Sequence, residues 1–317
     1  MTAADTSAIA PTLRDLIAQR ERVAAGMLRR GGVTGDGAGT HRATPLGRGM
    51  DFAEVRAYQP GDDLRSMDWR HTARRGRPFT KCFHEERERP LLVFIDLGPT
   101  MRFGTRVAFK SVLAARTAAL LAWATVDAGD RIGGVVWDGR THRDVRPRGR
   151  EAGALDLLRH LADTGPTAGS PTAPQASAAG GLAPPLRALA RAARPGTQVV
   201  LLSDFHALDA AAERELLQLR SGARLTLIQV FDALEATPPP AGIYRIGDAQ
   251  GEQTLDLRTA AARAAYGAPF RARRDRLASL ARRLGAAMIP LATDDDPLLA
   301  LRTLLGLQCG PQSATHA

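Results

Sequence analysis

Two aspartates are the residues of this chain that could do chemistry together. Asp96 directly follows the apolar run 91–95, and Asp204 closely follows a second run at 198–202. If both runs are parallel strands, their carboxyl ends meet at the sheet edge where open α/β proteins bind ligands. Neighbouring carboxylates can hold a divalent cation or act as general acid and base. We therefore expect any chemistry at this edge, and one interpretation is an Mg²⁺- or Mn²⁺-dependent hydrolase or phosphotransferase that uses Asp96 and Asp204.

A second stretch comes close to a phosphate-binding loop. Residues 104–111 follow a strand and open a helix, and Lys110-Ser111 stands where Gly-x4-Gly-Lys-Ser has its last two residues. Phe109 replaces the second glycine, and a side chain there keeps the backbone amides away from phosphate. Nucleotide binding is therefore not favoured. We expect Lys110 to lie along the helix with its ammonium group in water.

The elements that would position the two aspartates alternate between strands and helices. The run 91–95 predicts a buried strand, 105–127 a long helix and 131–137 a second strand, with a hairpin turn at Asp138-Gly139. The remaining pattern predicts an edge strand at 141–145, helices at 155–161, 186–193, 211–219, 271–284 and 297–305, strands at 198–202, 224–230 and 287–291, and a hairpin within 242–256. This alternation predicts an α/β fold with a doubly wound, mostly parallel sheet.

Three segments outside this alternation have distinct compositions. Residues 7–30 are expected to be helical, and the glycine-rich segment 31–44 is expected to be a flexible connection. Residues 164–181 are mostly Gly, Ala, Ser, Thr and Pro, too poor in large apolar residues to fold alone, so a mobile loop is expected there.

Composition limits the class of protein further. The chain has 317 residues and a formal net charge of +10, yet Lys81 and Lys110 are its only lysines and its arginines are scattered. Without a nucleic-acid-binding motif, this charge predicts a solvated basic surface and no nucleic-acid partner. No apolar run approaches the length of a bilayer span, and no secretory signal opens the sequence. Two distant cysteines, Cys82 and Cys309, fit a reducing cytoplasm.

A dense charged segment identifies a family resemblance. The pattern Phe52-x3-Arg56-x-Tyr58-x-Pro60-Gly61-Asp62-Asp63-x-Arg65-x2-Asp68-Trp69-x3-Ala73-Arg74 resembles the signature of the bacterial domain-of-unknown-function family fifty-eight, DUF58. The segment itself predicts a turn and a short helix that begins near Asp62 or Asp63. The resemblance covers nearly everything after Pro45. It implies a von Willebrand factor A-like domain with the signature segment packed on its sheet, and association with MoxR-type AAA+ ATPases.

The same resemblance implies a metal-ion-dependent adhesion site that is only partly kept. Its Asp-x-Ser-x-Ser element matches Asp96 and Thr100, but Gly98 supplies no ligand oxygen, and Leu182 stands near the place of a threonine. Asp204 matches the last acidic position. Three oxygen-bearing side chains, Asp96, Thr100 and Asp204, remain as candidate metal or partner contacts. Mg²⁺ is expected to bind weakly or not at all.

The expected division is a helical and flexible arm at 1–45, the signature segment at 46–90 and the von Willebrand factor A-like domain at 91–317. Trp69 could pack the signature segment onto the sheet, which is the favoured role, or anchor a partner. The candidate partner-binding residues are Arg65, Asp68, Trp69, Arg70 and Arg74. We expect a non-enzymatic cytoplasmic adaptor that works with a MoxR-type AAA+ ATPase on client proteins, and membrane-anchored von Willebrand factor A proteins are further expected partners.

Overall fold

The structure is a computed structural model that describes residues 8–28, 50–60, 63–85, 90–164, 181–248, 251–302 and 304. Its contacts divide the chain into two compact units. The main unit combines residues 1–32 with 89–317, and the signature unit comprises residues 33–88. The division differs from the expected one because residues 8–28 belong to the main unit and do not form a separate arm. The segments expected to be flexible, 31–44 and most of 164–181, lie outside the described residues.

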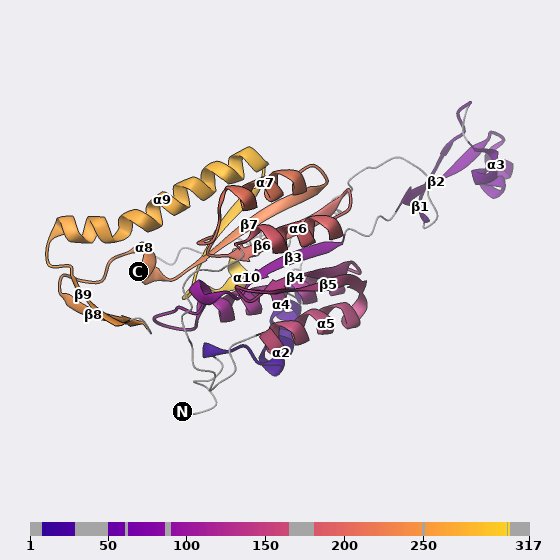
Figure 1. The fold of residues 1–317 in the computed structure, drawn as a ribbon. Helices are drawn as coiled ribbons and strands as arrows, with labels where there is room; N and C mark the ends of the chain where they lie inside the picture. The colour runs from indigo at the N-terminus through magenta and orange to yellow at the C-terminus, as the bar shows by residue number, and fades with distance from the viewer. Residues whose placement is uncertain are drawn as a thin grey trace, which may run out of the picture. The chain divides into compact units, whose positions relative to one another are not determined.

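A six-stranded sheet forms the centre of the main unit (Figure 1). Its strands are β3 (Leu91–Asp96), β4 (Arg131–Trp137), β5 (His142–Gly149), β6 (Thr197–Ser203), β7 (Ala223–Phe231) and β10 (Ala287–Ala292). They lie in the order β10-β7-β6-β3-β4-β5, and all neighbours are parallel except β4 and β5. The predicted α/β fold with a mostly parallel, doubly wound sheet is therefore confirmed.

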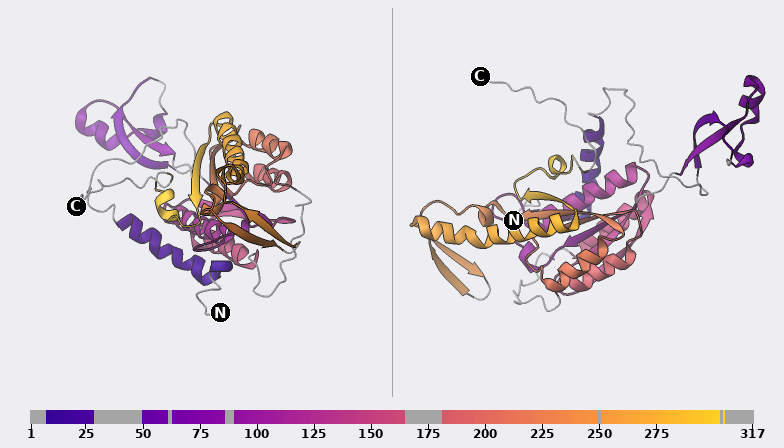
Figure 2. Two further views of the ribbon diagram at one scale, coloured as in Figure 1. Left: turned by 90° about the vertical axis from the view of Figure 1, so that its left-hand side faces the viewer. Right: turned by 90° about the horizontal axis from the view of Figure 1, so that it is seen from above.

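Helices cover both faces of this sheet (Figures 1 and 2). One face carries α2 (Leu13–Leu28), α4 (Lys110–Asp127) and α5 (Arg150–Thr164), and the other carries α6 (Ala183–Ala192), α7 (Ala210–Leu219) and α9 (Ala260–Leu284). Shorter elements are η2 (Pro99–Met101), α8 (Ala233–Ala236), α10 (Pro297–Ala300) and the predicted hairpin of β8 (Ile243–Asp248) with β9 (Gly251–Asp256). No helix within the described ranges combines the length and apolar character that a bilayer crossing requires.

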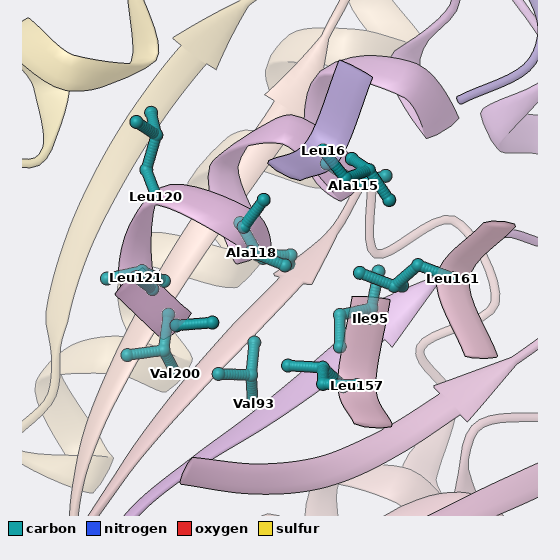
Figure 3. Close-up of a cluster of buried hydrophobic side chains, with 14 of the residues drawn as sticks. Leu16, Val93, Ile95, Ala115, Ala118, Leu120, Leu121, Leu157, Leu161 and Val200 are labelled. Carbon is teal, nitrogen blue, oxygen red and sulfur yellow. The ribbon is translucent and has the colours of Figure 1, made fainter. Parts of the chain in front are cut away.

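The core between the sheet and α4 is made of aliphatic side chains (Figure 3). Val93 and Ile95 of β3 face Ala118 and Leu121 of α4, and all four are almost completely excluded from solvent. Continuous apolar strands and an α4 that is buried nearly all round are what a sheet covered on both faces requires. The core thus fixes the carboxyl end of β3, where Asp96 lies.

Helix α2 is anchored to this layer by polar contacts as well as apolar ones. The Trp123 indole Nε1 donates a hydrogen bond to the Leu16 carbonyl at 3.2 Å, and Arg116 Nε lies 2.8 Å from Asp15 Oδ2. Leu16 itself is fully buried. These contacts explain why the N-terminal helix groups with the main unit.

The starts of α4 and α9 differ from those that the sequence pattern predicts. Helix α4 starts at Lys110 and not at Thr105, because the preceding loop folds onto itself: a Cβ on Gly104 would lie 2.2 Å from the Ala108 carbonyl oxygen. Helix α9 starts at Ala260, well before residue 271, with Thr259 as its N-cap. It continues through Pro269, which removes one backbone donor without ending the helix.

The signature unit contains its own small sheet. β1 (Met50–Ala57) pairs antiparallel with β2 (Phe79–Glu85), and η1 (Leu64–Ser66) and α3 (Trp69–Arg75) lie between them in the chain. The predicted short helix near Asp62 or Asp63 is η1, where Asp63 Oδ1 accepts the Arg65 N–H at 2.9 Å. Helix α3 begins later, with Asp68 as its N-cap: the Asp68 Oδ1 accepts the Arg70 and His71 N–H groups at 3.0 Å each. The helix ends at Gly76, whose φ of 67° is the left-handed conformation that favours glycine.

Candidate functional site

The expected site lies at the point where the strand order of the sheet reverses. The chain runs from β3 to β4 on one side and later returns to β6 on the other side of β3, and such switch points open a crevice at the carboxyl ends of the strands. Asp96 ends β3 there, and Ser203 ends β6. The Ser203 hydroxyl donates to Asp96 Oδ2 at 2.5 Å, and the Gly98 N–H donates to Asp96 Oδ1 at 2.8 Å. Both oxygens of Asp96 therefore have internal donors.

Asp204 binds a lysine. The Lys110 Nζ lies 2.8 Å from Asp204 Oδ2 and 3.1 Å from each carboxylate oxygen of Glu235. The Lys110 side chain is only 1% exposed. The expectation that Lys110 keeps its ammonium group in water is therefore wrong, because two carboxylates compensate the buried charge. We call Lys110, Asp204 and Glu235 the lysine cluster.

The backbone around Lys110 explains why its side chain points inward. Lys110 is the first residue of α4, and its N–H donates to the Phe103 carbonyl at 2.8 Å across the folded loop. The Phe109 N–H donates to the Ala8 carbonyl at 2.9 Å. The start of α4 is thereby held beside the carboxyl ends of β6 and β7, within reach of Asp204.

A second buried aspartate supports the cluster. Asp232 follows β7 and caps α8, where its Oδ1 accepts the Leu234 N–H and Glu235 Oε2 in return accepts the Asp232 N–H. Asp232 also accepts the Thr105 hydroxyl at 2.6 Å, the Thr105 N–H at 2.9 Å and the Thr293 hydroxyl at 2.6 Å. This one carboxylate therefore joins the ends of β7 and β10 to the loop before α4 and orients Glu235.

These environments move the carboxyl pKa values in opposite directions. Burial raises the pKa of Asp96 to about 7, and the negative charge of Asp204 adds to this effect. Burial alone would also raise the pKa of Asp204, but the Lys110 ammonium and hydrogen bonds from Lys110 and His206 hold it below its usual value. For Asp232, burial is likewise outweighed by the Thr105 and Thr293 hydroxyls, which lower its pKa. Asp204 and Asp232 are thus stabilised as anions, whereas Asp96 changes its protonation state near neutrality.

The residues at this edge do not fit the metal site that the resemblance implies. Mg²⁺ requires several oxygen ligands at close to octahedral geometry. Asp204 is already bound to an ammonium group, and Gly98 cannot be replaced freely by a ligating residue because a Cβ there would lie 3.0 Å from Asp96 Oδ1 and 3.3 Å from the Trp137 ring. In the described part of the chain, no group of three or more His, Cys, Asp or Glu side chains has a metal-binding arrangement.

Of the other two positions of the implied metal site, Thr100 lies at the edge and Leu182 does not. Thr100 is exposed and donates a hydrogen bond toward Asp204, so it stays at the edge. Leu182 caps α6 with its backbone, and its side chain is buried in the apolar core on that face of the sheet. The structure thus brings Asp96, Thr100 and Asp204 together, as predicted, but around Lys110.

Three members of the site were not expected from the sequence: Lys110, Glu235 and Asp232. A signal for Asp232 was present, since it directly follows the strand 223–231 just as Asp96 follows β3. Glu235 and Lys110 carried no comparable signal. Lys110 is 94 positions from Asp204 and 125 from Glu235, and only the sheet topology brings them together.

The candidate partner-binding residues lie in the signature unit. Arg65, Arg70 and Arg74 are exposed, and the Trp69 side chain is 68% exposed at the first position of α3. The favoured packing role of Trp69 is therefore not seen within this unit. Asp68 has a structural role as the helix cap.

Comparisons with known proteins agree with the signature. A family model described as "Protein of unknown function DUF58" matches residues 54–276. The chain belongs to the DUF58 family. This DUF58 protein is 31% identical over 266 residues to the uncharacterized proteins Rv1480 of Mycobacterium tuberculosis H37Rv and Mb1516 of Mycobacterium bovis, with 81% of this chain and 79% of each relative covered.

Solved structures similar to this DUF58 protein include the conserved hypothetical protein BatB from Bacteroides thetaiotaomicron, at 12% identity and a TM-score of 0.42, covering 69% of this chain and 96% of BatB. Another is a von Willebrand factor type A protein from Catenulispora acidiphila, at 12% identity and a TM-score of 0.40, covering 72% of this chain and 43% of that one. At these scores the likeness adds nothing to the architecture, which the sheet itself defines.

Proposed function

We propose that this DUF58 protein is a non-enzymatic binding adaptor that acts with a MoxR-type AAA+ ATPase in the assembly or activation of client proteins. The partner class follows from the family resemblance. The mode of binding follows from the sheet edge. Membrane-anchored von Willebrand factor A proteins are a second proposed class of partner, and the proposed location is the cytoplasm.

The observation that carries the proposal is a pinned surface loop with apolar side chains turned outward. Residues 99–109, which we call the edge loop, are tied down by the Asp232–Thr105 hydrogen bonds and by the Lys110 N–H bond to the Phe103 carbonyl. Within this loop Phe103 is 39% exposed and Val107 is 58% exposed. A rigid loop with exposed apolar side chains loses little conformational entropy on binding, so it suits partner recognition.

The burial of the carboxylates supports a binding role over catalysis. Asp96 and Asp204 are 1% and 4% exposed, and their oxygens are engaged by Ser203, Gly98 and Lys110. A substrate that used these carboxylates would have to displace those internal partners. Recognition through the exposed Thr100 and the apolar side chains of the edge loop requires no such displacement.

The signature unit offers a second proposed contact. Tryptophan and arginine are the residue types most enriched among those that dominate binding energy. Trp69, at 68% exposure, lies on α3 with exposed Arg70 and Arg74, and Arg65 is exposed just before the helix. This combination suits a partner surface that has both an apolar pocket and carboxylates.

One observation favours the rival function, a Mg²⁺- or Mn²⁺-dependent hydrolase or phosphotransferase. A carboxyl group whose pKa is raised to about 7, as for Asp96, has the value that a general acid–base at neutral pH needs. The test is turnover of phosphoester and ester substrates by the purified chain in the presence of either metal. We expect the wild type to show no metal-dependent turnover. Turnover by the wild type that is lost in Asp96→Asn would establish the hydrolase or phosphotransferase function.

The adaptor proposal is tested by capture from the native cell lysate. The purified full-length chain is used as bait, and the captured proteins are identified by mass spectrometry. We expect enrichment of a MoxR-type AAA+ ATPase with the wild type and its loss with Val107→Asp. The matched control is Ile243→Asp, which changes an equally apolar residue, 56% exposed, on the β8–β9 hairpin. Equal capture of the ATPase by both variants would contradict an edge-loop contact, and no capture by the wild type would contradict the partner.

A further inference from the structure

The Lys110 ammonium group is bound as a small cation would be. Its three N–H donors match three carboxylate oxygens at 2.8, 3.1 and 3.1 Å, from Asp204 at the end of β6 and Glu235 in α8. These distances are those of charge-assisted hydrogen bonds. The Phe103 ring also lies 5.9 Å from Nζ, within the range of a cation–π contact. The ammonium group is therefore fully coordinated by groups of the protein.

A divalent cation cannot bind Asp204 while Lys110 stays in place. Two cations that share one carboxylate would lie only a few ångströms apart, and repulsion between like charges at that distance is strong where water is excluded. Lys110 and Asp204 are 1% and 4% exposed, so solvent screens the charges little. A metal would have to expel the ammonium group from a position that the start of α4 determines.

The surroundings of Asp96 lead to the same conclusion independently. Its two oxygens accept the Ser203 hydroxyl and the Gly98 N–H, and a Cβ at position 98 would lie only 3.3 Å from the Trp137 ring. Position 98 has a ligating serine in the intact metal site. Here Gly98 supplies no ligand oxygen, a side chain in its place would require a neighbour to shift, and each Asp96 oxygen already accepts one internal hydrogen bond.

We propose that the Lys110 ammonium group is a built-in replacement for the divalent cation of this sheet edge, so that Asp204 and Glu235 bind a tethered cation and the edge loop is held without metal. It follows that partner binding through this edge is independent of divalent cations. This consequence rests on the proposed adaptor function. The replacement of the divalent cation by the Lys110 ammonium group does not rest on that function.

Removal of the tethered cation should therefore create a metal site. In Lys110→Met the apolar stem of the side chain is kept, Asp204 loses its cation, and Glu235 keeps only the more distant Arg273, at 4.0 Å. Mn²⁺ is the probe, because its electron paramagnetic resonance signal reports free and bound ion directly. We expect the wild type to bind no Mn²⁺ at millimolar concentration. We expect Lys110→Met to bind Mn²⁺ with a dissociation constant at least roughly tenfold below that concentration. Mn²⁺ should also raise the melting temperature of Lys110→Met and leave that of the wild type unchanged.

Two further variants make the test specific. The double variant Lys110→Met/Asp204→Asn should lose the gained Mn²⁺ binding. Arg116→Met removes another basic residue of α4, one that pairs with Asp15 away from the edge, and should gain none. A folded Lys110→Met that gains no Mn²⁺ binding would overturn the proposal. If Lys110→Met does not fold, the wild-type titration decides: Mn²⁺ binding that Asp204→Asn abolishes overturns the proposal, and no binding supports it. Because no partner is present, this result is separate from the fate of the adaptor function.

Discussion

The Lys110 ammonium group lies 2.8 Å from Asp204 Oδ2, and both side chains are almost completely excluded from solvent. This contact connects the start of α4 to the end of β6 across the switch point of the sheet. Because Glu235 binds the same ammonium group, the contact also reaches α8 beyond β7. The cluster is therefore expected to matter for stability as well as for the shape of the edge.

Removal of one partner of this pair should destabilise the fold strongly. Lys110→Ala leaves the buried Asp204 without its cation and leaves Glu235 with only Arg273, whose Nη2 lies 4.0 Å from Glu235 Oε1. Loss of one member of a buried ion pair costs roughly 3–5 kcal/mol. Equilibrium denaturation with guanidinium chloride measures the free energy of unfolding. The double variant Lys110→Met/Asp204→Leu should recover part of the loss, since it leaves no buried charge of the pair uncompensated. A loss near zero for Lys110→Ala would mean that the pair is not formed in solution.

The raised pKa of Asp96 predicts a pH dependence of stability with a definite sign. Its pKa rises from an ordinary value of 3.8 to about 7 in the folded protein. The stability that the protonated carboxyl contributes is fully present below pH 4 and is lost as the pH rises through about 7. Asp96→Asn removes this effect, so the variant should gain stability relative to the wild type between these pH values, by an amount on the order of a few kcal/mol.

Thermal unfolding at a series of pH values checks this prediction. Asp138→Asn is the control, because turn hydrogen bonds outweigh partial burial and lower the pKa of Asp138. The difference in melting temperature between Asp138→Asn and the wild type should change only in more acidic solution. If the difference in melting temperature between Asp96→Asn and the wild type stayed constant from pH 4 to 8, this would contradict a raised Asp96 pKa.

Asp232 should control the mobility of the edge loop. Asp232→Ala leaves the exposed Thr105 hydroxyl and the buried Thr293 hydroxyl without their acceptor, and the unsatisfied buried Thr293 hydroxyl costs about 1–3 kcal/mol. Hydrogen–deuterium exchange should show faster exchange in residues 99–109 and at the end of β10. The exposed Asp256, paired with Arg258, provides the control Asp256→Ala, which should leave that exchange unchanged. Unchanged exchange in Asp232→Ala would show that the loop is held by other contacts.

Helix α2 should behave as part of the main unit. Leu16 is fully buried and its neighbour Ile17 is 40% exposed, so the two form a matched pair on one helix. Leu16→Ala should lower the free energy of unfolding by roughly 2–5 kcal/mol, whereas Ile17→Ala should have a much smaller effect. Chemical denaturation followed by circular dichroism compares the two. Equal, small losses would indicate that α2 is detached from the core.

The sheet was predictable because its strands are continuous apolar runs. Runs such as 91–95 and 199–202 can be buried on both faces only in a covered parallel sheet, and the aspartates after them indicated the switch point. The starts of α4 and α9 were not predictable by periodicity. The first depends on a loop that Asp232 binds from 127 positions away, and the second on a helix that tolerates Pro269.

The candidate site was predictable in its location but not in its chemistry. Asp96 and Asp204 were placed correctly because each follows a strand. The inward turn of Lys110 could not be predicted, because a lysine at the start of a helix ordinarily reaches water. Its burial depends on two carboxylates distant in the sequence, which no local pattern reveals.

The most direct test of the adaptor function is a binding measurement between the purified full-length chain and a purified MoxR-type AAA+ ATPase from the same genome. Biolayer interferometry would compare the wild type with Val107→Asp and Ile243→Asp, two changes of similarly exposed apolar residues at different places on the main unit. We predict saturable binding by the wild type and by Ile243→Asp, and binding weakened by at least roughly tenfold for Val107→Asp. Equal affinity of all three proteins, or no binding by the wild type, would contradict recognition of this ATPase through the edge loop.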